Sequence, residues 1–446
     1  MTLSLAAIRE CLEGAVPATI ATCAPDATPN VSYVSHIHYV DESHVALSYQ
    51  FFSKTRENVL ANPHATALVI HPETGARYTL GLEYLRTETA GPLFEKMKAR
   101  LSGIASHTGM TGVFRLRGSD VYRVESIAPV PGPSLAPAPR RSLLGALREC
   151  AEHMSQAADL GTLLDSSLAL LDKAFGIKHA IVLILDATGS RLYTVASRGY
   201  AQSGVGSEIA VGCGVIGVAA AQATPIRVTH MTAEYSYSRA MRESAEREGL
   251  AGLIETSIPL PGLADSRSQL AVPILMAGRV QGVLFVESQE DLRFGYDDED
   301  ALVAFAAALG LAMLYLQQSS ENGEPARAPQ GGTEAAGGAP ILVRHYAADS
   351  SVFIGDDYLI KGVAGAIFAK LLRDGLRHGR TEFTNRELRL DASLRLPEVG
   401  DNLEARLILL QRRLAERCDF LRIEKTGRGR FRVEASRAYR LEDVGA

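Results

Sequence analysis

Two polar, low-complexity segments divide this chain and limit how much of it can share one core. Residues 129–141 are rich in proline and alanine, residues 319–340 are rich in glycine and alanine, and neither has an apolar period. Such compositions predict a semi-extended linker and a flexible tether, respectively. We therefore expect three folded units, at residues 1–128, 142–318 and 341–446.

The charge is unevenly distributed over these units. The 446 residues carry a net charge of −5, and the hydrophobic share of 46% is ordinary for a globular protein. Residues 341–446, however, hold 20 lysines and arginines against 16 acidic residues. A basic unit on an acidic remainder is typical of a tethered DNA-binding module, although the excess of +4 is modest.

The cysteines and the apolar runs indicate the cellular setting. The five cysteines are scattered and no CxxC spacing occurs, which argues against a zinc site or a disulfide framework. No metal site is expected. No run approaches the ~18–20 apolar residues needed to cross a membrane, and no apolar signal core follows Met1. We expect a cytoplasmic protein with no membrane partner.

The first unit alternates strand-like stretches with one short helix. Strand patterns occur at residues 18–22, 30–40, 44–49 and 65–70, and residues 51–63 read FFSKTRENVLANP. This segment begins with a serine cap and a basic turn and ends at Asn-Pro. Hydroxyls, a lysine and free helix amides favour a phosphate site. A capped surface helix can carry the same residues.

The order strand, strand, S-K-T-x-x-N-x-x-x-N-P, strand resembles the pyridoxamine-phosphate-oxidase-like split barrel, which typically binds a flavin. The resemblance implies that Ser53, Lys54 and Thr55 lie at the FMN phosphate, with two residues of the preceding strand near the isoalloxazine. The complete set of implied cofactor-binding residues is Ser35, His36, Phe52, Ser53, Lys54, Thr55 and Asn58. Some relatives bind F420 or haem instead, so both stay open as alternatives. The oxidase pattern is incomplete, and vitamin B6 oxidation is not expected.

The second unit is organised around residues 268–288, SQLAVPILMAGRVQGVLFVES. Two apolar runs flank an Ala-Gly-Arg connection, which predicts a buried β-hairpin. The acidic residues 297–300 predict the start of a helix. Upstream, VGCGVIG leads into an alanine-rich helix. Together these motifs resemble a GAF domain, a small-molecule sensor with an antiparallel sheet and helices.

The GAF resemblance leaves the ligand open. It implies that residues 230–253 cover the pocket, and the candidate ligand-binding residues there are His230, Tyr235, Tyr237 and Arg239. Residues 143–175 have the apolar spacing of a helix. In the resemblance this is the first helix, which either forms a homodimer or packs within one subunit.

The third unit has three apolar-periodic helices and a terminal hairpin. Helices are expected at residues 359–372, from Thr384 with a capping box to Glu387, and at residues 402–416. Hairpin strands follow at residues 420–424 and 429–434. The LxxRRL run and the TGRGRFRV hairpin resemble a winged helix of the response-regulator output type.

That resemblance implies a recognition helix with candidate DNA-binding residues Asn402, Arg406, Gln411, Arg412 and Arg413, and a wing with Arg428 and Arg430. In the simpler interpretation the arginines solvate an exposed helix and pair with acidic neighbours. Glu404 and Asp401 place negative charge at the start of this helix. Their carboxylates either accept a hydrogen bond from the amino group of cytosine or indicate that the wing binds protein instead of DNA.

The fold class is therefore a multidomain α/β and α+β chain: split β-barrel, GAF-type sheet and winged helix. We expect a homodimeric transcriptional regulator in which a small-molecule effector or redox state acts through the first two units on DNA. A flavin- or F420-dependent oxidoreductase is the first alternative, but no clear general acid, base or nucleophile is evident. A non-catalytic signalling scaffold is the second alternative.

Overall fold

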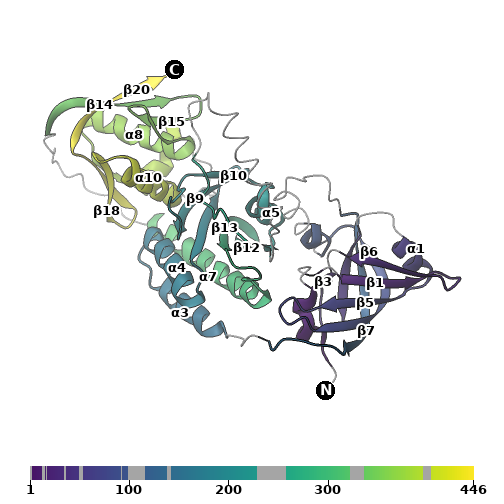
Figure 1. The fold of residues 1–446 in the computed structure, drawn as a ribbon. Helices are drawn as coiled ribbons and strands as arrows, with labels where there is room; N and C mark the ends of the chain where they lie inside the picture. Colours follow the sequence, from purple (N-terminus) through teal and green to yellow (C-terminus); the bar gives the residue numbers. More distant parts are fainter. Residues whose placement is uncertain are drawn as a thin grey trace.

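The computed structural model describes residues 3–12, 16, 18–34, 37–49, 54–91, 93–98, 116–137, 142–228, 258–321, 336–394 and 403–445. Three units follow one another along the molecule (Figure 1). We call them the N-terminal unit (residues 3–137), the middle unit (142–321) and the C-terminal unit (336–445). Most of the expected tether, residues 322–335, lies outside the described residues.

The N-terminal unit is built on one curled antiparallel sheet. In sheet order its strands are β2 (Pro29–Val34), β1 (Ala18–Cys23), β5 (His64–Ile70), β6 (Arg77–Glu88), β7 (Gly118–Val130), β4 (His44–Tyr49) and β3 (Ile37–Tyr39). Register shifts between the long strands β6 and β7 increase their twist. The expected short helix after β4 is present as α1 (Lys54–Ala61).

Before β1 the unit has a 3-10 helix, η1 (Leu5–Leu12), which is kinked at Ile8 and buries Leu5, Ile8 and Cys11. One predicted element of this unit differs in the structure. The strand expected over residues 30–40 is two strands, since β2 pairs with β1 whereas β3 pairs with β4 at the other edge of the sheet.

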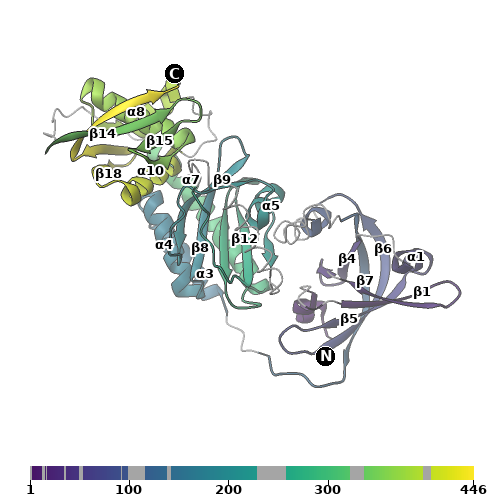
Figure 2. The same cartoon turned by 45° about the horizontal axis from the view of Figure 1, so that its top comes forward.

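The middle unit has a six-stranded antiparallel sheet between two helical layers (Figure 2). Its strands are β10 (Glu208–Ala210), β9 (Arg191–Arg198), β8 (His179–Leu185), β13 (Arg279–Ser288), β12 (Ser268–Met276) and β11 (Ile226–Val228). One face carries α3 (Leu144–Ser155), α4 (Leu160–Phe175) and α7 (Tyr296–Glu321), and the other carries α5 (Gly214–Gln222).

The predicted central hairpin is confirmed. Met276 pairs with Arg279, and the two residues between them, Ala277 and Gly278, have φ of 47° and 75°. These left-handed conformations are those of a type I′ turn, whose twist matches the paired strands. In the VGCGVIG motif, Gly217 lets α5 approach β10, since a Cβ there would lie 2.4 Å from Ala210 O.

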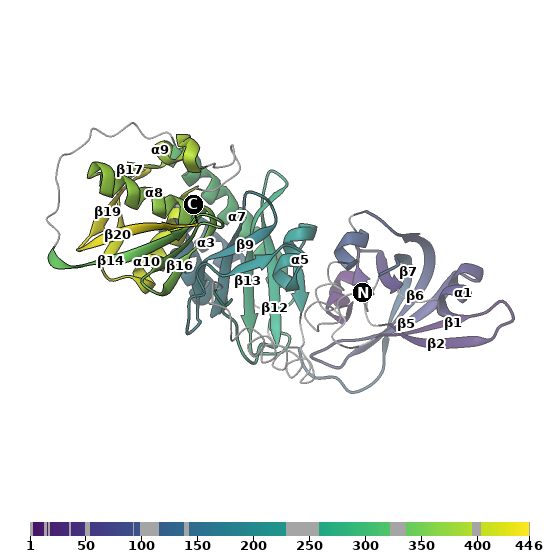
Figure 3. The same cartoon turned by 90° about the horizontal axis from the view of Figure 1, so that it is seen from above.

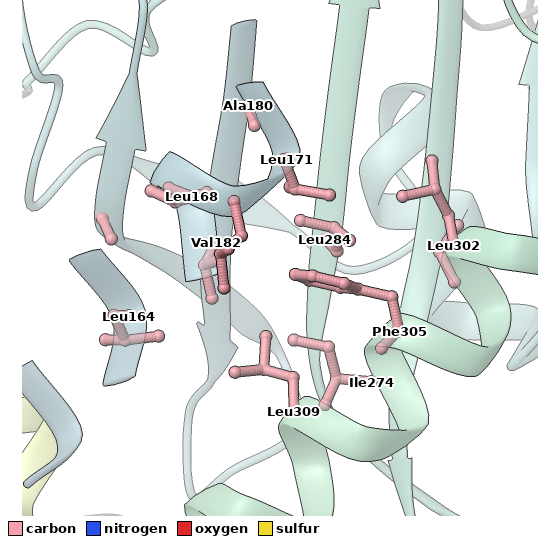
Figure 4. Close-up of a cluster of buried hydrophobic side chains, with 14 of the residues drawn as sticks. Leu164, Leu168, Leu171, Ala180, Val182, Ile274, Leu284, Leu302, Phe305 and Leu309 are labelled. Carbon is pink, nitrogen blue, oxygen red and sulfur yellow. The ribbon is translucent and has the colours of Figure 1, made fainter. Parts of the chain in front are cut away.

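The larger core of the middle unit lies between the sheet and the three-helix layer. Figure 4 shows Phe305 and Leu309 of α7 directed at Ile274 and Leu284 of the hairpin, with Leu168 of α4 on the same side of the sheet. The helix expected over residues 143–175 is broken into α3 and α4. Asp159 caps α4 by accepting from Thr162 N at 3.0 Å, and this cap starts a new helix.

Helix α7 corrects one expectation. Over residues Tyr296–Ser319 it has a mean hydropathy of 1.7, so by length and composition alone it could cross a membrane, and 44% of that window is buried within the protein. The expectation that no segment is that long and apolar is therefore wrong for this helix. Leu302, Phe305 and Leu309 lie in the core, which accounts for their apolar character.

The described part of the C-terminal unit combines two small sheets with three α-helices, drawn in green and yellow in Figure 3. The first sheet has β16 (Asp357–Ile360), β15 (Ser351–Ile354), β14 (Ala336–Tyr346) and β20 (Arg437–Val444), and β14 and β20 are parallel. The second has β17 (Glu382–Thr384), β19 (Arg430–Ala435) and β18 (Leu421–Gly427). The helices are α8 (Gly362–His378), α9 (Asn385–Leu390) and α10 (Leu403–Arg417), with a short 3-10 turn η2 (Ala392–Leu394) before α10.

Local sequence signals in this unit are largely confirmed. Thr384 and Glu387 form the predicted capping box, with Glu387 N donating to Thr384 Oγ1 at 3.2 Å and Thr384 N donating to Glu387 Oε2 at 3.0 Å. The predicted hairpin is β18–β19. The helix expected from residue 359 begins instead at Gly362, because Leu359 and Ile360 belong to β16.

Candidate functional site

Helix α1 of the N-terminal unit holds two of the predicted phosphate-site residues at its start. Lys54 has a side chain that is 57% exposed, with Glu57 Oε2 3.5 Å from Nζ. Thr55 Oγ1 accepts from Asn30 Nδ2 at 2.9 Å, so its proton is still available to a ligand. These two groups fit an anion at the helix start.

Asn58 has a different position from the one predicted. It is 1% exposed, and its Nδ2 donates to Thr22 Oγ1 at 3.1 Å. Its side chain therefore fixes α1 on β1. Ser35, His36, Phe52 and Ser53 lie outside the described residues. The described part of the predicted set thus fits a flavin phosphate at Lys54 and Thr55 only.

A buried charge network beside α1 was not predicted. Arg56 Nη1 lies 2.5 Å from Asp120 Oδ1 on β7, and Arg56 Nη2 donates to Thr87 Oγ1 at 3.1 Å. The Arg56 guanidinium also stacks 4.0 Å from the Tyr49 ring centroid. Burial lowers the pKa of Arg56, but the bond to Asp120 outweighs it and the net pKa is raised. Arg56 therefore ties α1 to β4, β6 and β7 as a permanent cation.

The sheet of the middle unit carries a buried polar group at one end of the α5 face. Glu287 is 2% exposed and follows Phe285, so by strand alternation both side chains face α5. Its Oε1 accepts from Leu263 N at 2.9 Å, and its Oε2 accepts from Gln269 Nε2 at 3.4 Å. Among the described residues no cation is paired with this carboxylate, which makes it a candidate anchor for a ligand donor.

Tyr200 lies close to this carboxylate. The Tyr200 hydroxyl is buried beside this carboxylate, and burial together with the charge and hydrogen bonding of Glu287 raises its pKa. Its ring centroid is 5.5 Å from that of His179. The predicted pocket residues His230, Tyr235, Tyr237 and Arg239 lie outside the described residues. Glu287 was not predicted from the sequence, although a charged residue directly after the apolar run VLFV is a signal that could have identified it.

Three of the predicted DNA-binding arginines on α10 are engaged within the protein. Arg406 is 5% exposed, with its guanidinium 4.1 Å from the Tyr193 ring centroid on β9. Arg412 donates to Val195 O at 2.8 Å and to Asp165 Oδ1 at 2.7 Å. Arg413 is 3% exposed and donates to Leu359 O at 3.1 Å.

The remaining predicted DNA-binding residues are less enclosed. Gln411 is exposed, with Nε2 donating to Ile423 O at 3.1 Å, and Arg428 is exposed at the turn of the β18–β19 hairpin. Arg430 begins β19 and is partly buried, and Asn402 lies outside the described residues. Glu404 is 8% exposed and accepts from Lys425 Nζ at 3.2 Å, so its carboxylate is turned toward the hairpin.

Comparison with known protein families matches two parts of the chain. Residues 4–123 match the model of the pyridoxamine 5′-phosphate oxidase family, and residues 157–313 match that of the GAF domain. No curated protein matches the chain. Neither family match reaches the C-terminal unit.

Solved structures resemble parts of the chain at low identity. The GAF domain of an Acinetobacter phosphoenolpyruvate-protein phosphotransferase is 21% identical, covering 39% of this chain and 94% of its own, with a TM-score of 0.31. Free methionine-R-sulfoxide reductase from Neisseria meningitidis is 21% identical, covering 40% and 93%, with a TM-score of 0.30. An FMN-binding protein from Syntrophomonas wolfei is 19% identical, covering 28% and 89%, with a TM-score of 0.24.

The family assignment rests on the two sequence models together with the sheet orders described above. The curled N-terminal sheet and the six-stranded middle sheet with helices on both faces agree with them. A sensory module is thus joined to a flavin-type fold in one polypeptide. The chain is a multidomain sensory or regulatory protein with a pyridoxamine-phosphate-oxidase-like N-terminal domain and a GAF domain.

Proposed function

We propose that this protein is a ligand- or redox-responsive transcriptional regulator whose C-terminal unit binds DNA as a winged helix. The observation that carries the proposal is the succession α8, β17, α9, α10 and the β18–β19 hairpin, with exposed Arg428 at the hairpin turn. In a winged helix α10 enters the major groove and the hairpin contacts the backbone. The basic balance of residues 341–446 favours the same partner.

The N-terminal domain is proposed to bind FMN, with F420 or haem as alternatives. Lys54 and the Thr55 hydroxyl would hold the phosphate. Arg56 would hold α1 in place through its ion pair with Asp120 on β7. The cofactor would supply redox chemistry or a redox signal. A flavin spectrum from freshly purified protein supports FMN, a Soret band supports haem, and a colourless protein contradicts both.

The GAF domain is proposed to receive a small-molecule effector on the α5 face of its sheet. Glu287 and the Tyr200 hydroxyl would provide polar groups at the end of an apolar sheet surface that α5 covers and that includes the buried Phe285. Such a surface suits a largely apolar molecule with one amine or hydroxyl group.

A homodimer is proposed through α7. Its solvent-facing side carries Val303, Leu311 and Tyr315, exposed by 41%, 65% and 63%, and the exposed Ala307 completes the four-residue spacing between them. A continuous apolar stripe on an outer helix is typical of a helix–helix interface. Two DNA-binding units would then be available for two half-sites.

Gel retardation of DNA from the gene's own upstream region tests the main proposal. Binding should weaken steeply with added salt because arginines displace counterions from phosphates. Arg428→Ala should weaken binding, while Arg386→Ala, an exposed arginine on α9, serves as the charge-matched control. Equal retardation by both variants would show that the hairpin turn is not at the DNA.

One observation favours a second candidate, a signalling scaffold. The side of α10 that faces away from its own core carries Ala405 and Ile408, which lie in the core cluster of the GAF domain. Apolar residues there suit protein contacts better than a groove in DNA. Absence of salt-dependent DNA binding by the full chain and all its variants would favour the scaffold.

A further inference from the structure

Helix α10 is enclosed from two sides by two different cores. Leu403, Leu407, Leu410 and Leu414 lie in the core cluster of the C-terminal unit. Ala405 and Ile408 lie in the cluster that contains α4 and α7 of the GAF domain, and Ile408 Cδ1 would be 4.0 Å from a Cβ on Gly161. The helix is therefore an interdomain element as well as a core helix.

Polar contacts also hold α10 against the GAF domain, and they engage arginines that were predicted to bind DNA. Arg412 bridges Asp165 of α4 and the carbonyl of Val195 on β9. Arg406 stacks on Tyr193 of β9. Both terminal nitrogens of the Arg412 guanidinium are directed at the GAF domain, so its fork is not presented to a phosphate or a base edge. The helix face that would enter a major groove is covered.

The connection from β9 to β10, residues 199–207, forms the second part of this contact. Val205 is 3% exposed and belongs to the core cluster of the C-terminal unit. Ser203 Oγ donates to Glu416 of α10, and a Cβ on Gly206 would be 3.7 Å from Leu409 Cδ1. We call residues 199–207 the strap.

The strap also touches the candidate effector surface. It contains Tyr200, whose hydroxyl lies near Glu287, only three residues before Ser203. In addition, Leu263 N binds Glu287, and Pro261 of the same segment lies against the strap, where a Cβ on Gly204 would be 2.1 Å from Pro261 Cδ. Adjoining, tightly packed residues therefore connect Glu287 with the α10 contact.

We propose that the GAF domain masks α10, and that an effector bound at the Glu287 end releases α10 for DNA by moving the strap. This inference rests on the proposed DNA binding. In the masked state the apparent dissociation constant for DNA equals the intrinsic one divided by the undocked fraction. Any change that weakens the docking contact therefore tightens DNA binding without altering a residue that touches DNA.

Charge reversal at the docking contact tests the masking. Asp165→Lys places a lysine opposite Arg412, at a side chain that is 71% exposed, so folding is preserved. Asp172→Lys is the matched control, because it makes the same charge change on α4 but faces Arg198 within the GAF domain. With a fluorescent duplex from the upstream region, Asp165→Lys should bind about threefold more tightly than Asp172→Lys.

A second variant disrupts the strap side of the contact. Val205→Asp puts a carboxylate into the apolar cluster of the C-terminal unit and should tighten DNA binding about tenfold or more in the full chain. If neither Val205→Asp nor Asp165→Lys binds DNA more tightly than Asp172→Lys, masking is wrong.

A reducible cross-link tests the masking separately from the proposed DNA binding on which it rests. Ser203→Cys with Glu416→Cys joins two positions in direct contact, and a short reducible bismaleimide should link them within one chain. The linked protein should lose DNA binding and regain it on reduction; wild type treated alike is the control. Unchanged binding after linking overturns the masking. If no form binds DNA with salt dependence, linked or reduced, the proposed DNA binding itself has failed.

Discussion

Truncation of Ile408 measures how strongly the GAF domain and the C-terminal unit hold each other. Ile408 is 8% exposed, and it lies in the GAF core cluster although it belongs to α10. Ile→Ala in a core costs about 2–5 kcal/mol, and the lower end applies here because an interdomain contact can relax around the loss. We expect about 2 kcal/mol, which changes the docked-to-undocked ratio about 30-fold.

Thermal unfolding followed by calorimetry is the assay. Docked units stabilise each other, so in the wild type the contact raises the temperature at which the C-terminal unit unfolds. For a unit of this size, 2 kcal/mol corresponds to a drop of about 10 °C in its transition. Leu376→Ala on α8 is the control, since this leucine is 51% exposed and should shift the transition by less than about 2 °C. Equal shifts in both variants would refute the shared-helix argument.

The other predictions concern the remaining units and their charges. Replacing Arg56 by Met leaves Asp120, which is 6% exposed, without its cation; the N-terminal domain should lose about 3 kcal/mol in urea unfolding, and a loss below about 1 kcal/mol would contradict the network. Hydrogen bonds from Lys370 lower the pKa of Asp391 to about 2. Because the folded pKa lies below the unfolded value of 3.8, this contribution is present above about pH 4 and is lost as the pH falls toward 2. The Asp391 side chain is 25% exposed and its ion pair with Lys370 is therefore partly screened by solvent, so Asp391→Asn should remove less than about 1 kcal/mol, and only at pH values where the carboxylate is ionised. A stability loss of the variant that persists unchanged at pH 2 would contradict this assignment. Leu311→Glu should convert the proposed dimer to monomer in light scattering, and an unchanged mass would exclude α7 as the interface.

Local signals in the sequence predicted local structure well. The hairpin at residues 268–288 followed from two apolar runs around a short turn, and the capping box at Thr384 followed from residue type and spacing. Both depend on neighbours within a few residues, so the chemistry that fixes them is visible in the sequence itself. The break between α3 and α4 also had a local cause, the Asp159 cap, but the continuous apolar spacing obscured it.

The partners of α10 were not predictable in the same way. Arg412 and Asp165 are 247 residues apart, and nothing near either residue indicates the other. The leucine stripe of α10 predicted one buried face, whereas Ala405 and Ile408 bury a second one. Similarly, Asn58 in the S-K-T-x-x-N motif was expected at a cofactor but holds α1 on β1 through Thr22. A residue type suited to ligand binding is equally suited to an internal hydrogen bond, and only the fold decides between them.

The parallel pairing of β14 with β20 bears on how the protein is made. His345 and Asp443 pair across these strands although 98 residues separate them, so the first sheet of the C-terminal unit closes only after β20 has left the ribosome. The GAF domain precedes β14 and has had time to fold by then. During that interval α10 can settle on a finished GAF surface before its own unit is complete. A newly synthesised molecule would therefore emerge with α10 docked on the GAF domain. Under the proposed masking, its affinity for DNA would be low from the start.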